Sequence, residues 1–346
     1  MQPSIAIVGA TGAVGCVMRQ LLLERRVPFR SIKFLASERS AGKLIEFAGR
    51  THEVEPLRPE AFEGVDLVLS STPAAVSREW SPIAARAGAI VVDNSSAWRM
   101  DPDVPLVVPE VNPHALDRIP KGIVANPNCS TIQMVVALKP LHDLARIKRI
   151  VVCTYQASSG KGATGLCELD AQIVALGRGE PLPPVKAHRD RLAGNVLPHD
   201  WKLGEDGYSE EEWKMIRETR KILGDESILV SPTTARVPVR TGHSEAVNVE
   251  FHNPITVEQA REALRRAPGV IVLDDYAAGV VPLPIHAEGR DETFVGRIRK
   301  DPTVPHGLNL WVVADNLRKG AATNAVQIAE VLLARGRVGR KLAPAR

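Results

Sequence analysis

The feature that most constrains the fold is an apolar run near the start of the chain that leads directly into a glycine-rich turn. Residues 4–8 (SIAIV) read as a strand buried on both faces of a parallel sheet. Residues 9–15 (GATGAVG) follow at once, and Met18, Leu21 and Leu22 then recur at helical spacing. A strand, a glycine turn and a helix in this order predict an α/β nucleotide-binding domain, because the glycines let the backbone approach a pyrophosphate at the helix N-terminus.

The end of the second predicted strand bears on the choice of cofactor. This strand covers residues 31–36, and Ser37, Glu38, Arg39 and Ser40 follow it. An acidic residue at this place holds the ribose hydroxyls of NAD, whereas an arginine nearby accommodates the 2′-phosphate of NADP. Because Glu38 is surrounded by hydroxyls and cationic side chains, the sequence favours NADP.

Two further buried strands, residues 66–70 and 89–93, flank a predicted helix over residues 74–87. The second of these strands is followed by a segment rich in hydrogen-bonding groups, which ends in Arg99. Ligands of such sheets bind at the carboxyl ends of the strands. Arg99 is therefore a candidate ligand for an anion, and a surface ion pair is the alternative.

A second strand-to-helix turn carries a cysteine. Residues 122–124 (GIV) predict a short strand, and residues 132–138 (IQMVVAL) predict a largely buried helix. Between them, Pro127 keeps Asn126 out of the helical region, so that Cys129 lies at or near the helix N-terminus. The unpaired amides there stabilise negative charge, which favours the nucleophilic thiolate. Cys129 is a candidate nucleophile, and a cysteine that only packs is the alternative.

Beyond this turn the short alternation of strands and helices ends, which predicts a separate α+β domain with a mixed sheet. Residues 158–163 (SSGKGA) are expected to form a flexible loop able to close over phosphate or nicotinamide, and residues 182–198 an excursion from the core. The strands expected in this domain cover residues 149–157, 245–251, 270–274, 293–299 and 308–314.

A capping box and a second helix-opening segment mark helices in the second half of the chain. Residues 209–212 (SEEE) predict a helix that continues through Ile222, and residues 256–259 (TVEQ) predict another. Glu211 and Lys214 share one face of the first helix at i and i+3. On spacing alone, this pair is either part of a site or a simple surface ion pair.

The length of 346 residues favours two domains. Residues 316–334 predict a last helix that packs back on the first domain. We therefore expect a nucleotide-binding domain over residues 1–128 with residues 316–346, and a second domain over residues 129–315.

Composition limits the partners and the compartment. A net charge of +4, with scattered basic residues and only 4% aromatic residues, does not indicate nucleic-acid binding. No apolar run reaches the ~20 residues of a membrane span, and the first residues do not resemble a signal peptide. Four cysteines form no disulfide framework, and no CxxC or HExxH spacing suggests a metal. The sequence thus predicts a cytoplasmic protein with free thiols and without metal, membrane or nucleic acid.

Four motifs, in order along the chain, carry a family resemblance. They are residues 9–15, residues 127–131 (PNCST), residues 236–244 (RVPVRTGHS) and residues 315–322 (DNLRKGAA). Together they resemble the bacterial aspartate-semialdehyde dehydrogenases, over the whole chain. The resemblance implies an α/β protein with a Rossmann-type NADP-binding domain and an α+β catalytic and dimerisation domain with a mixed sheet. It also implies a homodimer or a dimer of dimers.

The same resemblance implies roles for individual residues. Cys129 would be the acyl-carrying nucleophile, His243 the acid/base, and Gln156 the group that orients the acyl intermediate. The implied substrate-binding residues are Arg236 and Glu211 for the carboxylate and amino groups, Arg99 and Lys214 for phosphate, and also Asn128 and Gln156. The implied NADP-binding residues are Gly9, Thr11, Gly12, Ala13, Val14, Arg39, Ser40, Ser159, Gly160 and Asn316.

The implied reaction is the reversible, NADPH-dependent conversion of L-aspartyl-4-phosphate into L-aspartate 4-semialdehyde and inorganic phosphate. It belongs to the biosynthesis of lysine (through diaminopimelate), threonine, methionine and isoleucine. A thiol suits both steps, because its hemithioacetal gives up hydride readily and its thioester keeps a good leaving group. A histidine of near-neutral pKa can take and return the protons, and two cationic side chains match a dianionic phosphate.

Two alternatives stay open. N-acetyl-γ-glutamyl-phosphate reductase has similar chemistry on an acylated, longer substrate, but such a substrate gives Glu211 no ammonium to meet. In that family we also expect a different sequence after the cysteine than Ser130 and Thr131. A non-catalytic NADP-binding paralogue would be expected to lose Cys129 or His243, and this chain keeps both.

Overall fold

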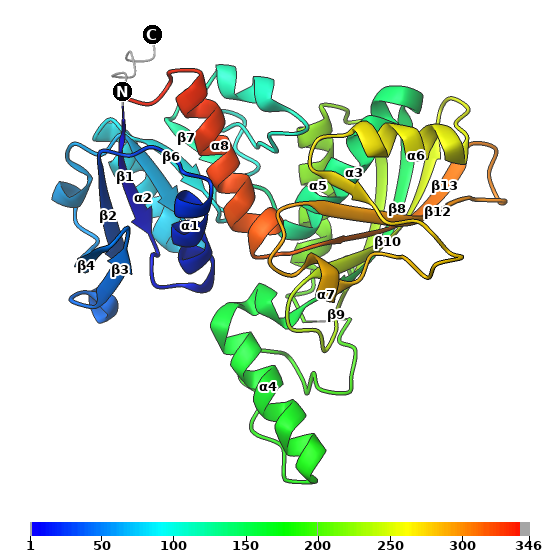
Figure 1. Ribbon diagram of the computed structural model, residues 1–346, viewed down its shortest axis with the longest axis horizontal. Helices are drawn as coiled ribbons and strands as arrows, with labels where there is room; N and C mark the ends of the chain where they lie inside the picture. The colour runs from blue at the N-terminus through cyan, green and yellow to red at the C-terminus, as the bar shows by residue number, and fades with distance from the viewer. Residues whose placement is uncertain (1, 199, 340–346) are drawn as a thin grey trace. The chain divides into compact units, whose positions relative to one another are not determined.

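The computed structural model describes residues 2–198 and 200–339, which divide into two compact units (Figure 1). Unit 1 combines the residues up to Pro127 with those from Ala321 onward, and unit 2 extends from Asn128 to Gly320. The sequence places these boundaries after residue 128 and before residue 316. Residues 340–346, the end of the expected first domain, lie outside the described residues. Among the described helices, none is long and apolar enough to cross a membrane.

Unit 1 is built on one sheet with the strand order β3-β4-β2-β1-β5-β6-β7. β3 and β4 pair antiparallel, and the other neighbouring strands pair parallel. The strands are β1 (Ser4–Val8), β2 (Ser31–Ala36), β3 (Leu44–Phe47), β4 (Arg50–Pro56), β5 (Leu67–Ser70), β6 (Ile90–Asp93) and β7 (Ile123–Ala125). The helices are α1 (Ala13–Glu24), α2 (Ala74–Arg86) and α8 (Thr323–Ala334), with short turns η1 (Glu38–Ser40), η2 (Pro59–Phe62) and η3 (Pro113–Asp117).

The core of unit 1 explains why the end of the chain returns to its beginning. Met18 and Leu22 of α1 pack with Val326 and Leu332 of α8 in one apolar cluster, together with β-strand residues such as Ile7. The C-terminal helix therefore covers the same sheet as the N-terminal βα unit, as expected from the sequence. It begins later than predicted, because residues Arg318–Ala322 form a π-helical segment, η5, before α8 starts.

The glycine turn after β1 has the geometry that its sequence predicts. Gly9 has a φ of +80°, and a Cβ at this position would lie 2.2 Å from the carbonyl oxygen of Ser71. A Cβ at Gly15 would lie 2.3 Å from the carbonyl oxygen of Gly9, and Gly12 is the N-cap of α1. The first glycine is therefore required by a left-handed backbone, and the third by the close packing of α1 on the turn.

The hairpin of β3 and β4 has no counterpart among the elements predicted from the sequence. Its two turn residues, Ala48 and Gly49, have φ angles of +51° and +76°. Positive φ at both positions gives the turn a twist that matches the twist of the paired strands. An alanine in this conformation gives no sequence signal. Ile45 and Phe47 point into the core, whereas Leu44 is 69% exposed.

Unit 2 contains a mixed sheet with the strand order β11-β12-β13-β10-β8-β9, as expected. β8 pairs parallel with β9 and β11 with β12, and the other neighbours are antiparallel. The strands are β8 (Ile147–Gln156), β9 (Leu229–Arg236), β10 (His243–Phe251), β11 (Val270–Val272), β12 (Thr293–Lys300) and β13 (Gly307–Ala314). The helices are α3 (Cys129–Ala145), α4 (Gly162–Arg178), α5 (Glu210–Leu223), α6 (Val257–Arg266) and α7 (Pro284–Ala287), with the turn η4 (Ser158–Lys161).

Strand β9 and helix α4 were not among the predicted elements. β9 contains Pro232, which argues against a central strand, but β9 lies at the edge of the sheet, where a proline is tolerated. The prediction of a flexible loop over residues 158–163 is wrong, because these residues form the turn η4 and the start of α4. Ser158 and Ser159 are buried in η4, where their N–H groups donate to the carbonyl oxygens of Val239 and Arg240, and α4 follows directly.

Helices cover one face of the unit 2 sheet, and the other face is covered only in part. Side chains of α3, α5 and α6, such as Leu138, Met215 and Leu264, form one core with the inward side chains of β8, β10 and β13. On the opposite face, Tyr155 of β8 is 37% exposed, and its ring lies 5.4 Å from that of Trp311 of β13. Trp311 also packs against a buried cluster of Ala287, Phe294 and Val313, so α7 covers part of this face while Tyr155 stays exposed.

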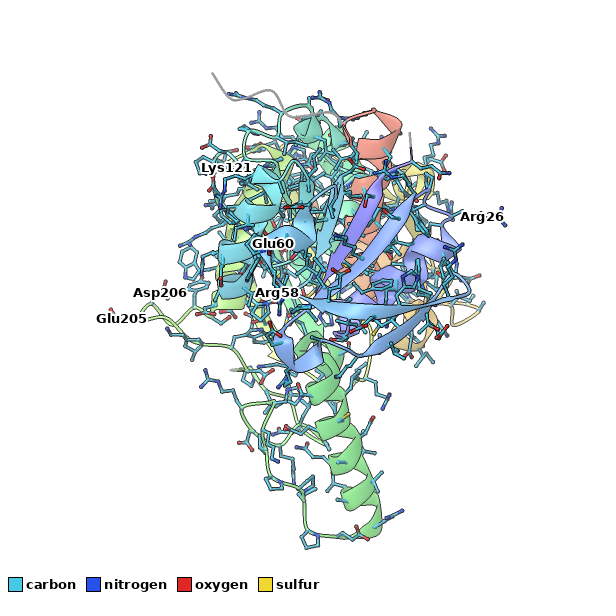
Figure 2. All side chains as sticks on the ribbon, turned by 90° about the vertical axis from the view of Figure 1, so that its left-hand side faces the viewer. Arg26, Arg58, Glu60, Lys121, Glu205 and Asp206 are labelled. Atoms are coloured by element: carbon cyan, nitrogen blue, oxygen red, sulfur yellow. The ribbon has the colours of Figure 1, made fainter. Side chains whose placement is uncertain are left out.

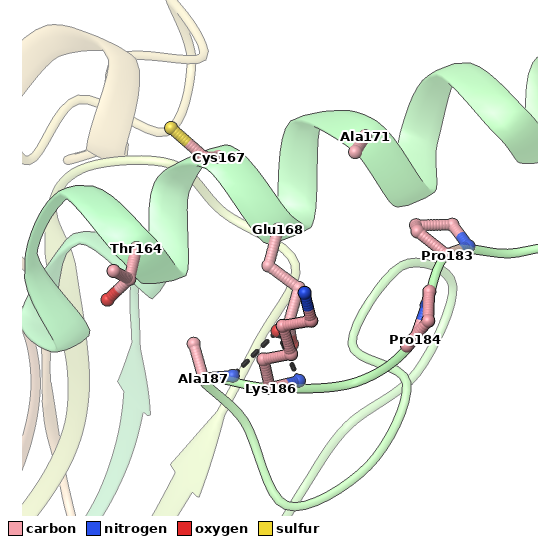
Figure 3. A pocket seen from close by; sticks show the side chains of 8 residues that line it. All are labelled: Thr164, Cys167, Glu168, Ala171, Pro183, Pro184, Lys186 and Ala187. Atoms are coloured by element: carbon pink, nitrogen blue, oxygen red, sulfur yellow. Dashed lines mark hydrogen bonds between the residues drawn. The ribbon is translucent and has the colours of Figure 1, made fainter.

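Helix α4 extends away from the sheet of unit 2 and carries the excursion that follows it along its side (Figure 1). The carboxylate of Glu168 on α4 accepts hydrogen bonds from the N–H groups of Lys186 and Ala187, both at 2.6 Å (Figure 3). Gln172, one turn further along α4, accepts from the N–H groups of Leu192 and Ala193. The excursion is thus fixed to α4 through its backbone.

Candidate active site

Cys129 is the first residue of α3, as the sequence predicts. Asn128 is the N-cap, and its Oδ1 accepts hydrogen bonds from the N–H groups of Ser130 at 3.0 Å and Thr131 at 3.2 Å. The start of this helix favours negative charge at the thiol. A Cβ at Gly320 would lie 2.9 Å from the Cβ of Cys129, so only a glycine fits against the cysteine at this point.

A buried carboxylate joins the predicted substrate residues around Cys129. Oε1 of Glu211 accepts from Nδ2 of Asn128 at 2.7 Å and from Nε2 of Gln156 at 3.2 Å. Oε2 accepts from Nζ of Lys214 at 3.1 Å. Burial alone would raise the pKa of Glu211, but the Lys214 ammonium and the two amides outweigh it and lower the pKa to about 2. Glu211 is therefore a carboxylate at any working pH.

Gln156, the last residue of β8, connects this cluster to the residue after the nucleophile. Its Nε2 also donates to Oγ of Ser130 at 2.6 Å, and its side chain is buried. On the other side, Oε2 of Glu218 accepts from the backbone N–H of Asn128 at 2.6 Å. Neither Ser130 nor Glu218 was predicted as a site residue, although Glu218 lies on the same helix as Glu211.

His243, the first residue of β10, is completely buried. Its Nδ1 accepts a hydrogen bond from the N–H of Ala157 at 3.0 Å, so the proton of the neutral ring lies on Nε2. Burial, reinforced by the positive charge of Arg236, lowers the pKa of His243 to about 3, although Glu211 acts in the opposite direction. The near-neutral pKa expected from the sequence is wrong for this arrangement. Nε2 has no hydrogen-bond partner among the described residues.

Arg236 ends β9 and is also buried. Its Nε donates to Oδ2 of Asp200 at 2.9 Å, and one terminal nitrogen donates to the carbonyl oxygen of Ala157 at 2.7 Å. Gly160 brings Arg236 and His243 together, since a Cβ there would lie 2.7 Å from the same guanidinium nitrogen and 3.5 Å from Cε1 of His243. Gly160 thus lies against the two groups expected to handle the substrate.

Two further residues expected to bind the cofactor lie beside this group in unit 2. Oδ1 of Asn316 accepts from Oγ of Ser159 at 2.9 Å and from the N–H of Gly242 at 3.0 Å. Asn316 therefore ties the turn after β8 to the turn before β10.

Five of the seven cofactor residues expected in unit 1 line a cavity of about 470 Å³ at the carboxyl ends of β1, β2 and β5. The cavity lies where the strand order reverses direction, which is where such sheets bind nucleotides. The predicted residues in its lining are Gly9, Thr11, Gly12, Arg39 and Ser40, and Ala13 and Val14 lie in the first turn of α1. Glu38 also lines it, and its carboxylate lies 3.5 Å from the guanidinium of Arg58, which is labelled in Figure 2.

Arg99 lies in unit 1, where it is buried and donates to two backbone carbonyl oxygens, those of Asn126 at 2.9 Å and Asn94 at 3.1 Å. The segment before it is held by the buried carboxylate of Asp93. Oδ1 of Asp93 accepts from the N–H and the hydroxyl of Ser95, and Oδ2 accepts from the hydroxyl of Ser77. Asp93 thereby fixes the turn that carries Arg99.

A second buried carboxyl group lies close to His243 and was not predicted. Glu245, two residues further along β10, is completely buried, and neither of its oxygens has a well-formed hydrogen bond to a described residue. Burial raises its pKa well above the usual range, and the amide of Gln133 on α3 offsets this only in part. No sequence motif indicates that Glu245 is buried rather than exposed on the surface of its strand.

Comparisons with known proteins agree with these two units. Residues 4–119 match a family model described as semialdehyde dehydrogenase, NAD binding domain, and residues 138–319 match semialdehyde dehydrogenase, dimerisation domain. The aspartate-semialdehyde dehydrogenase of Aquifex aeolicus is 55% identical over 96% of this chain and 98% of its own length.

Solved structures share the fold over nearly the whole chain. The crystal structure of aspartate semialdehyde dehydrogenase II from Vibrio cholerae, complexed with ASA, superposes with a TM-score of 0.94 at 46% identity, covering 96% of this chain and 99% of that one. The aspartate semialdehyde dehydrogenase from Candida albicans with NADP gives a TM-score of 0.76 at 28% identity, covering 97% and 99%. The predicted fold and family resemblance are confirmed. The chain belongs to the aspartate-semialdehyde dehydrogenase family and is an enzyme of that family.

Proposed function

We propose that this enzyme reduces L-aspartyl-4-phosphate to L-aspartate 4-semialdehyde with NADPH, through a thioester on Cys129. The observation that carries the proposal is the position of Cys129 between Asn128 and Ser130. The side chains of these two residues contact Glu211 and Gln156. A nucleophile at a helix start thus adjoins one connected group of polar side chains.

The covalent steps follow from the chemistry of a thiol. The Cys129 sulfur attacks the carbonyl carbon at position 4, the C–S bond forms, and phosphate leaves with the electrons of its C–O bond. NADPH, when bound, supplies the hydride that reduces the thioester. The C–S bond then breaks, which regenerates the thiolate and releases the semialdehyde. The reverse sequence consumes phosphate.

His243 is proposed as the acid/base group, and its geometry supports the donor half of that role. Because Nδ1 is occupied by the N–H of Ala157, Nε2 carries the proton. A buried donor without a partner among the described residues suits an oxygen that becomes negative in a tetrahedral intermediate. Gln156 is proposed to orient the acyl group, since its amide donates a hydrogen bond to the hydroxyl of Ser130, the residue after Cys129.

The amino-acid part of the substrate is proposed to bind Arg236 and Glu211. A guanidinium holds a carboxylate with two parallel hydrogen bonds, and a buried carboxylate of low pKa matches an ammonium. This pairing favours an unacylated amino group and therefore argues against N-acetyl-γ-glutamyl phosphate. Arg99 and Lys214 are proposed as phosphate ligands, and Asn128 as a further substrate contact.

The cofactor is proposed to be NADP, bound by the glycine turn and cavity of unit 1, and the family resemblance adds Ser159, Gly160 and Asn316 as proposed ligands. Because a Cβ at Gly9 or Gly15 would collide with backbone atoms, the glycines keep this turn tight. A tight glycine turn at a helix N-terminus suits a pyrophosphate. Arg39 and Ser40 line the cavity, where they suit a 2′-phosphate, and Arg58 offsets the charge of Glu38. The related structure from Candida albicans holds NADP.

We further propose a homodimer, or a dimer of dimers, that forms through unit 2. Its residues match a dimerisation domain, and the sheet face that carries the aromatic pair Tyr155 and Trp311 is covered only in part by the described residues. A cytoplasmic role in making lysine, threonine, methionine and isoleucine is proposed from the reaction itself.

Phosphate-dependent reduction of NADP⁺ tests the proposed function. L-aspartate 4-semialdehyde should support turnover that requires phosphate, and N-acetyl-glutamate semialdehyde should not. A preference for the acetylated aldehyde would identify the enzyme as the other reductase. Cofactor binding without turnover on either aldehyde would indicate a non-catalytic paralogue.

A further inference from the structure

Arg236 is held by two consecutive residues that no sequence motif marks. Asp200 accepts a hydrogen bond from Nε of Arg236 at 2.9 Å, along one edge of the guanidinium. The ring of Trp201 lies against the guanidinium face, with its centroid 4.6 Å from Cζ. One residue therefore fixes the edge of the group and the other its face, while Ala157 accepts from one terminal nitrogen.

Asp200 is itself fixed on several sides. Its Oδ1 accepts from the N–H of Arg189 at 3.0 Å, and its Oδ2 accepts from Nδ1 of His188 at 3.3 Å. Lys161 lies 3.6 Å away, and the other ring nitrogen of His188 lies 2.9 Å from Oγ of Ser158. Burial would raise the pKa of Asp200, but the hydrogen bonds from His188 and Arg236 hold it well below its usual range. The group is a permanent anion.

The excursion over residues 182–198, which precedes Asp200 in the chain, is hydrogen-bonded to α4 before it contacts Arg236. Glu168 and Gln172 of α4 hold its backbone at residues 186–187 and 192–193 (Figure 3). Leu197 then forms a bridge with Arg236 itself, through two backbone hydrogen bonds of 2.9 and 2.8 Å. The excursion is thus hydrogen-bonded to α4 along its length and to the end of β9 at Leu197.

Although Arg236 is buried, the contacts do not use all of its hydrogen-bond donors. Of the five N–H donors of an arginine, two are used by described residues, on Asp200 and Ala157. We propose that Asp200 and Trp201 are positioning residues, which fix the guanidinium of Arg236 in the orientation that receives the carboxylate of the substrate. This inference rests on the proposed function of Arg236.

Steady-state kinetics in the phosphorylating direction test the inference, with saturating phosphate and NADP⁺ and varied semialdehyde. Trp201→Leu removes the stacked ring without changing charge, so the Michaelis constant for the semialdehyde should rise about three- to tenfold while kcat stays within about twofold. Trp201→Phe restores a ring and should recover most of the loss. Asp200→Ala should raise the same constant at least as much, and its NADP affinity reports whether it is folded.

A matched control comes from a second stacked pair. Trp213 lies 4.6 Å from Cζ of Arg217, and its Nε1 donates to Asp206, which is labelled in Figure 2. Trp213→Leu removes the same kind of contact and should leave the Michaelis constant for the semialdehyde unchanged. In an Arg236→Lys background, Trp201→Leu should add little, because the planar group that it supports is absent.

The outcomes separate the inference from the proposed function. A wild-type Michaelis constant in Trp201→Leu and in folded Asp200→Ala, together with a raised one in Arg236→Lys, would overturn the inference and leave the role of Arg236 intact. An unchanged constant in Arg236→Lys would instead remove the carboxylate role of Arg236, and the inference with it.

Discussion

The backbone N–H of Ala157 donates to Nδ1 of His243 across 3.0 Å, and this bond determines which nitrogen of the neutral ring carries the proton. Ala157 follows the last residue of β8, so the end of that strand fixes the tautomer of a residue at the start of β10. With Nδ1 occupied, the neutral ring offers Nε2–H as a donor. In the substrate-free protein, His243 is therefore buried and uncharged, with its pKa lowered by burial.

The first prediction concerns that state. In the substrate-free protein, His243 should stay neutral with its proton on Nε2 between about pH 5 and 8, because burial lowers its pKa to about 3. Imidazole ¹⁵N chemical shifts, with His243→Asn to assign the signal, measure both the tautomer and the charge. A titration midpoint near the ordinary histidine pKa of about 6.5 would contradict this.

Glu245 gives a prediction about stability. Its pKa is raised in the folded state, so the folded protein binds a proton that the unfolded chain releases. The wild type should therefore lose stability as pH rises from about 4.5 through the raised pKa. Glu245→Gln has no proton to lose, so its stability relative to wild type should grow by about 1.4 kcal/mol per pH unit across that window. Urea unfolding at several pH values checks this, and a difference independent of pH would refute it.

Arg39 tests the choice of cofactor. Arg39→Ala should raise the Michaelis constant for NADP at least about tenfold more than that for NAD, because it removes the proposed ligand of the 2′-phosphate, a group that NAD lacks. Arg30→Ala removes an exposed arginine just before β2, whereas Arg39 follows the same strand, so it is the matched control. Equal changes for both cofactors in Arg39→Ala would place Arg39 away from the phosphate.

The partly exposed sheet face of Tyr155 and Trp311 yields a prediction about assembly. Ala246 pairs with Cys153 and Trp311 in the middle of that face, and an arginine there would bury an unpaired charge in the proposed interface. Light scattering after size-exclusion chromatography should show a dimer for wild type and mostly monomer for Ala246→Arg. Leu44→Arg, on an exposed position of unit 1, should stay dimeric. A dimeric Ala246→Arg protein would place the interface elsewhere.

The sequence predicts those parts of the structure that are determined by residues close together in the chain. The glycine turn, the capped start of α3 and the capping box of α5 are set by residues within a few positions of one another, and each appears as predicted. β9 and the β3–β4 hairpin depend on tertiary context instead. A proline in an edge strand and an alanine at positive φ give no such signal.

The same contrast holds for the candidate site. The structure joins Asn128, Gln156, Glu211 and Lys214 as one group, although they come from separate segments. Asp200 and Trp201 could not be predicted, because their contact with Arg236 depends on how the excursion folds back from α4. The low pKa of His243 is likewise a consequence of complete burial, which a single sequence does not show.

The central claim is that Cys129 carries the acyl group, and intact-protein mass spectrometry tests it most directly. Enzyme incubated with L-aspartyl-4-phosphate in the absence of NADPH should gain one aspartyl group, located on the peptide that contains Cys129 and removed by hydroxylamine. Added NADPH should discharge it as semialdehyde, and Cys129→Ser should show neither adduct nor turnover. An adduct on Cys16, Cys153 or Cys167, or turnover by Cys129→Ser at the wild-type rate, would contradict the account.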